Sequence, residues 1–132
     1  MNPADVAQYK ALYLKTARQY VTAIKDSLTQ LAQSPADQAL IAKAHLSAHS
    51  LGSQSLVMGF TQIGQLSRTV EYLFYGIKQT NGSVTPEMIT AITQVAQTMD
   101  TILTDIEQNV AEPDMQQTIT ALKTQFAIGD PK

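Results

Sequence analysis

A histidine lies on the flank of a strongly helical stretch, with very small residues close to it. Gly52 and Ser53 follow His49 by three and four positions, which places them one helical turn beyond it. A histidine can act as a nucleophile when one ring nitrogen is unprotonated and the other is held by a hydrogen-bond acceptor. Small neighbours suit a histidine that the active site of another protein must approach closely. The pattern is compatible with nucleophilic attack by the imidazole of His49; alternatively, His49 would be an ordinary surface residue or a hydrogen-bonded partner of a core group.

Glu71 is the candidate for the acceptor that would hold this imidazole. Gly59 is expected to end the helix of His49, and another helix follows almost at once. His49 lies ten residues before Gly59 and Glu71 twelve after it, so an antiparallel pair would place them at about the same height. A carboxylate holding the Nδ1 proton would leave the Nε2 lone pair pointing outward. Alternatively, Glu71 would be a solvated charge that pairs with Arg68 or Lys78.

A second histidine, His45, lies one turn before His49 on the same face. Two histidines at i and i+4 can ligate a metal ion, but a functional site normally has a third ligand. Carboxylates are the only candidates for that ligand, Glu71 among them. We expect His45 to line a docking surface and expect no metal site. A metal-binding helical bundle is kept as an alternative.

The elements that must position these residues are helices, because apolar residues recur every three or four positions and no region alternates as a strand does. A cap residue followed by proline marks helix starts at Asn2-Pro3, Ser34-Pro35 and Thr85-Pro86. The apolar face of the first helix would start with Val6 and Tyr9, and that of the fourth would end with Val110. The inner stripe of the second helix would be Ala44, Ala48, Leu51, Ser55 and Met58.

Four such helices with short links predict an all-α fold, an antiparallel up-and-down four-helix bundle. A short fifth helix from Met115 to Phe126 would pack on it as an accessory. We expect residues 1–132 to form a single domain that closes its own core as a monomer.

Composition narrows the class of function. The net charge of −2 gives no basic field for nucleic acid. The chain has no cysteine and no apolar run that approaches a membrane span, and its N-terminus lacks the layout of a signal peptide. No glycine loop for phosphate and no nucleotide-binding fingerprint is present, so we expect no kinase activity of its own. The expectation is a cytoplasmic helical domain that binds neither nucleic acid nor membrane.

The sequence around His49 reads Ala48-His49-Ser50-Leu51, followed by Ser53, by Met58-Gly59-Phe60 and by a glutamate twenty-two residues past the histidine. This motif resembles that of histidine-containing phosphotransfer (Hpt) domains, which include the N-terminal domain of chemotaxis-type histidine kinases. The resemblance covers residues 44–71 as a motif and roughly 5–110 as architecture.

This resemblance implies a phosphocarrier in two-component signalling. His49 would accept a phosphoryl group from a histidine kinase catalytic domain and pass it to an aspartate of a response-regulator receiver domain, while Glu71 orients the imidazole. Met58 and Phe60 would pack the corner behind it. The domain would hold no cofactor, and Mg²⁺ and ATP would come with the partners. The expected docking surface comprises His45, Gly52, Ser53, Leu56 and Arg68.

The chain departs from the family's pattern at Gly52 and Ser53, where the family usually has a lysine and a glycine. Loss of the lysine removes a cation near the phosphoryl group, for which Arg68 would be a partial substitute or else a plain surface charge. The departure motivates a competing hypothesis, a phosphorylation-incompetent adaptor that docks receiver or kinase domains without accepting phosphate.

Overall fold

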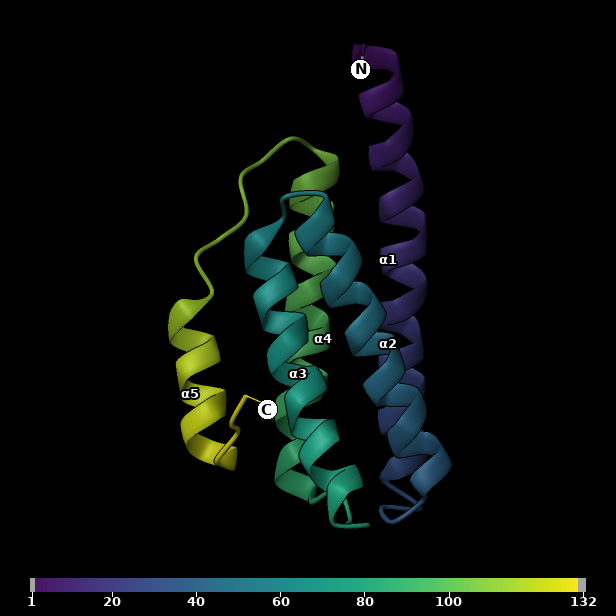
Figure 1. The fold of residues 1–132 in the computed structure, drawn as a ribbon, viewed down its shortest axis with the longest axis vertical. Helices are drawn as coiled ribbons and strands as arrows, with labels where there is room; N and C mark the ends of the chain where they lie inside the picture. The colour runs from purple at the N-terminus through teal and green to yellow at the C-terminus, as the bar shows by residue number, and fades with distance from the viewer. Residues whose placement is uncertain (1, 131–132) are drawn as a thin grey trace.

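The structure, a computed structural model, describes residues 2–130 and contains five helices in that range. They are α1 (Pro3–Leu31), α2 (Gln38–Val57), α3 (Thr61–Gln79), α4 (Pro86–Glu107) and α5 (Gln116–Phe126). The first four run alternately up and down, and α5 packs beside α3 on the outside (Figure 1). The predicted all-α bundle with an accessory fifth helix is confirmed.

Three helices begin at side-chain caps, and two of the three predicted caps are confirmed. Asn2 accepts a hydrogen bond from the backbone of Asp5 at 2.9 Å, and Thr85 caps α4. The predicted cap at Ser34 is wrong, because α2 begins three residues later than expected. Its cap is Asp37, whose carboxylate accepts hydrogen bonds from two backbone N–H groups of the first turn.

The helix that follows the corner has no local cap, and a distant residue supplies one. The carboxylate of Glu112 accepts hydrogen bonds from the backbone N–H groups of Gln62, at 3.4 Å, and Ile63, at 2.8 Å. A carboxylate at this end also suits the partial positive charge of the helix terminus. The segment after α4 therefore fixes the start of α3, the helix that carries Glu71.

The core lies between the four long helices, and the predicted inner stripe of α2 is confirmed. Ala44, Ala48, Leu51 and Ser55 are buried, and Met58 is half-buried against the core. With a rise of 1.5 Å per residue, the 29 residues of α1 span about 43 Å and the 20 residues of α2 about 30 Å. The N-terminal turns of α1 therefore project past the α2–α3 corner (Figure 1).

Three residues predicted to face inward are exposed at these ends of the bundle. Val6 and Tyr9 lie on the projecting turns of α1, where no neighbouring helix covers them. Val110 is exposed because α4 ends at Glu107. The apolar spacing continues past the point at which the partner helices stop, and this is why the sequence overestimated the buried face.

The corner between α2 and α3 is anchored to α1. Gly59 has a φ of 85°, a left-handed conformation that an L side chain would strain. The hydroxyl groups of Tyr13 and Ser55 are 2.7 Å apart, and the rings of Tyr13 and Phe60 pack with centroids 5.2 Å apart. Burial raises the pKa of Tyr13 to about 12. These contacts fix the corner on α1 and thereby the register between α2 and α3.

Candidate functional site

The candidate site lies on the α2–α3 hairpin, whose two helices are paired in one register. Residues of the two helices that meet across the interface have numbers that sum to 120. Four such pairs are in contact or nearly so: His45–Tyr75, His49–Glu71, Gly52–Arg68 and Leu56–Gly64. Successive pairs are three or four residues apart, about one helical turn. Each pair forms one rung of a ladder that ends at the corner.

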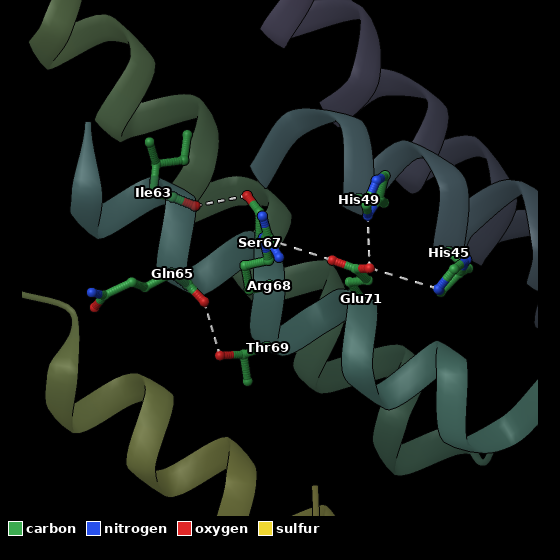
Figure 2. Close-up of polar contacts among 8 residues, drawn as sticks. All are labelled: His45, His49, Ile63, Gln65, Ser67, Arg68, Thr69 and Glu71. Atoms are coloured by element: carbon green, nitrogen blue, oxygen red, sulfur yellow. Dashed lines mark hydrogen bonds and ion pairs between the residues drawn. The ribbon is translucent and has the colours of Figure 1, made fainter. Parts of the chain in front are cut away.

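His49 and Glu71 form the central rung. The Nδ1 of His49 is 2.8 Å from the Oε2 of Glu71, within hydrogen-bond distance (Figure 2). The side chain of His49 is 49% exposed, whereas that of Glu71 is only 10% exposed. The other ring nitrogen of His49 points away from the carboxylate (Figure 2). The spacing argument from Gly59 therefore placed these two groups correctly, and the predicted alternative of a solvated Glu71 is wrong.

This contact determines the tautomer of His49 when its imidazole is neutral. An ionised carboxylate only accepts hydrogen bonds, so the proton of a neutral ring lies on Nδ1. The Nε2 then carries the lone pair on the outer side of the ring. Such an imidazole is arranged for nucleophilic attack on a group that approaches from solvent.

The second histidine shares the carboxylate of Glu71 without a hydrogen bond to it. The Nε2 of His45 is 3.9 Å from the Oε2 of Glu71, and its ring packs against Tyr75 with centroids 6.2 Å apart. Burial lowers the pKa of His45 below its ordinary value of 6.5, and Lys78 lowers it further, while Glu71 opposes both. His45 is therefore neutral near pH 7.

The residues that the structure describes offer no third metal ligand beside His45 and His49. Among residues 2–130, no group of three histidine, cysteine, aspartate or glutamate side chains is placed to hold a metal ion. The Nδ1 of His49, moreover, is already engaged by Glu71.

Comparison with known protein families matches residues 8–102 to one family, described as the Hpt domain. The chain belongs to the Hpt domain family. Its curated relatives include the chemotaxis protein CheA of Listeria monocytogenes, 25% identical over 113 residues that cover 85% of this chain and 18% of the relative. The CheA of Bacillus subtilis is 22% identical over 102 residues, which cover 77% of this chain and 15% of the relative.

A solved structure agrees with this membership. The solution structure of the histidine phosphotransfer domain of CheA matches with a TM-score of 0.82 at 19% identity, covering 95% of this chain and 96% of that one. At this identity the likeness establishes a shared fold. This chain spans less than a fifth of the length of its curated CheA relatives, 18% and 15% of the two named above.

In this Hpt domain part of the predicted docking surface on α2 lies against α3. Gly52 is buried, and Leu56 is half-buried and lies over Gly64, so both face α3 rather than solvent. The expectation that Gly52 forms part of an open docking surface is wrong. The side chains of His45, Ser53 and Arg68 are partly exposed, and the docking role expected for them stays a prediction.

Sequence reasoning missed two exposed apolar residues on the same helix. Leu46 and Val57 are exposed, Val57 at 87%, three residues before His49 and eight after it. A groove between α1 and α2 is lined by Leu12 and Val57 and reaches Ser53, one turn from His49. The signal in the sequence was the pair of large apolar residues just outside the predicted inner stripe.

The tight rung between Leu56 and Gly64 gives a matched pair of glycine substitutions. An added Cβ at Gly64 would lie 2.6 Å from Cδ2 and 2.7 Å from Cγ of Leu56, whereas a Cβ at Gly52 would meet nothing closer than 3.4 Å. Gly64→Ala should therefore destabilise the Hpt domain by about 1–3 kcal/mol through overpacking. Gly52→Ala should instead be stabilising by up to about 1 kcal/mol, because alanine favours helix.

Urea unfolding followed by circular dichroism measures both changes. Equal effects of the two substitutions would show that the helices separate freely at this rung, and would contradict the rigid register on which the site depends.

Proposed function

We propose that this Hpt domain is a histidine phosphocarrier that accepts a phosphoryl group on His49 and passes it to a carboxylate of a receiver domain. One observation carries the proposal: the half-exposed imidazole of His49 has its Nδ1 2.8 Å from the buried carboxylate of Glu71. Family membership and the CheA relatives support it. The domain supplies a nucleophile in the correct tautomer on a rigid helix, and the partners supply ATP and Mg²⁺.

The phosphoryl group moves in two steps, from ATP to His49 and from His49 to the receiver aspartate, and neither step needs a further reactant. In the first, the Nε2 lone pair of His49 attacks the γ-phosphorus of ATP held by a histidine kinase domain. An N–P bond forms, the bond between this phosphorus and the β–γ bridging oxygen breaks, and ADP leaves. The resulting phosphoimidazole keeps its Nδ1 proton, which Glu71 stabilises as the ring gains positive charge. In the second transfer an aspartate oxygen attacks the phosphorus, and the N–P electron pair returns to Nε2.

Labelled phosphate tests this function directly. The chain is incubated with a histidine kinase domain of the CheA type and labelled MgATP, and a receiver domain is then added. The expected label on the chain is acid-labile and alkali-stable, as a phosphohistidine is, and it moves to the receiver. Absence of label with every competent kinase would overturn the carrier and favour the competing adaptor, which docks such partners without accepting phosphate.

We assign the receiver to the groove between α1 and α2. The groove ends one turn from His49, so a receiver whose aspartate reaches the phosphoryl group covers it. Its lining includes the exposed Leu12 and Val57, which a partner would remove from water.

A charge placed in this groove should slow transfer. Val57→Glu should lower the rate of transfer to the receiver about tenfold, because docking would bury the new carboxylate, while phosphorylation by a small donor is unchanged. Val110→Glu is the matched control, since Val110 is also exposed but lies outside this groove. Stopped-flow or gel-based transfer assays measure both, and equal rates for the two variants would place the receiver elsewhere.

Among the residues that the structure describes, no helix is long and apolar enough to cross a membrane.

A further inference from the structure

Two buried polar atoms beside His49 face each other without a hydrogen bond. The Nε of Arg68 and the Oε1 of Glu71 are both out of contact with water, and neither has a hydrogen-bond partner within residues 2–130. They are 3.9 Å apart, close enough for an ion pair but too far for a hydrogen bond. A buried donor without an acceptor costs free energy, so its presence next to a reactive side chain calls for an explanation.

The side chain of Arg68 passes close to Gly52, the residue opposite it on α2. A Cβ at Gly52 would lie 3.5 Å from the Cδ of Arg68, an ordinary van der Waals distance, so the aliphatic part of the arginine lies against this part of α2. The Arg68 side chain is 35% exposed although its Nε is buried, so other atoms of that side chain reach solvent. Figure 2 shows Arg68 beside Glu71, on the side opposite to His45.

The charges of the site change when His49 is phosphorylated. A phosphoryl group brings about two negative charges to the outer side of the ring, next to the carboxylate of Glu71. The Gly52–Arg68 rung is three residues from that of His49, about 4.5 Å along the helix, whereas Lys78 is seven residues beyond Glu71, about 10 Å away. His45 is neutral near pH 7. Arg68 is therefore the cation best placed to offset the new charge.

We infer that Arg68 is the phosphoryl-binding cation of this site, held over Gly52 so that its guanidinium donates hydrogen bonds to the phosphoryl oxygens on His49. The inference rests on the proposed phosphocarrier function and identifies a further residue of that reaction. A guanidinium suits this task, since its planar donors match the oxygens of a phosphoryl group. The buried Nε faces Glu71, while other atoms of the Arg68 side chain reach solvent, from where the incoming group approaches.

A small phosphoryl donor tests Arg68 without any protein partner. Phosphoramidate transfers its phosphoryl group to the Nε2 of His49 as its own P–N bond breaks and ammonia leaves. Phosphorus NMR of the full chain gives the rate at which phosphohistidine forms and, after removal of the donor, its half-life. Arg68→Ala should slow formation about fivefold, the effect of one partly exposed charge contact. Arg68→Lys should recover at least about half of the lost rate, because the positive charge is kept.

A relocated cation separates charge from packing. In the double variant Gly52→Lys with Arg68→Ala, the new lysine starts from the helix opposite, in space that the arginine has vacated, and should restore at least about half of the lost rate. Arg18→Ala is the matched control: Arg18 lies on α1 and pairs with Glu107 of α4 at 3.5 Å, so its removal should leave the rate unchanged. Thermal melting by circular dichroism verifies that each variant is folded.

The outcomes distinguish a failure of the inference about Arg68 from a failure of the phosphocarrier function. If the native chain gains label on His49 but Arg68→Ala matches it, the inference about Arg68 is overturned while the phosphocarrier stands. Slow formation that neither lysine variant rescues would make Arg68 a packing residue and would also overturn the inference. If neither phosphoramidate nor a kinase labels His49 in the native chain, the phosphocarrier fails, and the role of Arg68 fails with it.

Discussion

Replacing His49 with glutamine should reduce phosphate incorporation to background, a fall of more than about three orders of magnitude. The glutamine amide can still donate a hydrogen bond to Glu71, but its nitrogen has no lone pair available for attack on phosphorus. Because the native side chain is half-exposed, the free energy of unfolding should change by less than about 0.5 kcal/mol. Loss of label would then reflect chemistry rather than unfolding.

His45→Gln is the matched control for this substitution. The two histidines lie one turn apart near the same carboxylate, but only His49 is within hydrogen-bond distance of it, at 2.8 Å against 3.9 Å for His45. His45→Gln should therefore keep most of the label. If label persists in His49→Gln and disappears in His45→Gln, the acceptor is the other imidazole and the assignment is wrong.

The register between α2 and α3 could be predicted from the sequence because it depends on the position of the corner and on the constant rise per residue of a helix. Gly59 marks the corner, and a fixed rise per residue then places His49 opposite Glu71. The predicted helices follow from the same kind of local information, since apolar spacing and Pro-marked caps are written in consecutive residues. For this reason the sequence alone predicts both the bundle and the contact between His49 and Glu71.

The part of α2 that α3 covers beside the inner stripe could not be predicted in the same way. Small or apolar residues occur on several of its faces, so periodicity alone does not tell whether Gly52 or Val57 meets solvent. Packing decides this: Leu56 lies directly over Gly64, and Gly52 is buried against Gly64, Ser67 and Arg68 of α3. The predicted docking surface was therefore wrong at Gly52, although the inner stripe of α2 and the height of His49 on it were predicted correctly.

The N-terminal caps of α2 and α3 could not be predicted from neighbouring residues. Both Ser34 and Asp37 are good cap residues, so the local sequence does not distinguish them. In the structure Asp37 is the cap, and the loop before it contacts the rest of the bundle, where the carbonyl of Pro35 accepts a hydrogen bond from the backbone N–H of Val84. The cap of α3 comes from Glu112, 49 residues from the backbone N–H of Ile63 that it binds. No pattern in neighbouring residues announces such a contact.

The burial of Glu71 changes what its removal should do. An exposed ion pair would contribute little to stability, but this residue is only 8% exposed and faces two histidines and Arg68. Truncation would leave the buried Nε of Arg68 without its counter-charge. We therefore expect Glu71→Ala to destabilise the fold by about 1–3 kcal/mol, a change that urea unfolding measures.

Glu71→Ala should also slow phosphorylation of His49 about ten- to a hundredfold, because the ring loses the acceptor that fixes its tautomer and orientation. Glu71→Gln separates the hydrogen bond from the charge: its amide oxygen still accepts the Nδ1 proton, so it should recover most of the rate. Glu107→Ala is the matched control, an exposed acid that pairs with Arg18 on α1. Rates measured with phosphoramidate exclude effects on kinase docking. If Glu71→Ala proves less stable but is phosphorylated at the native rate, the carboxylate is structural, and the lone pair of His49 needs no support from α3.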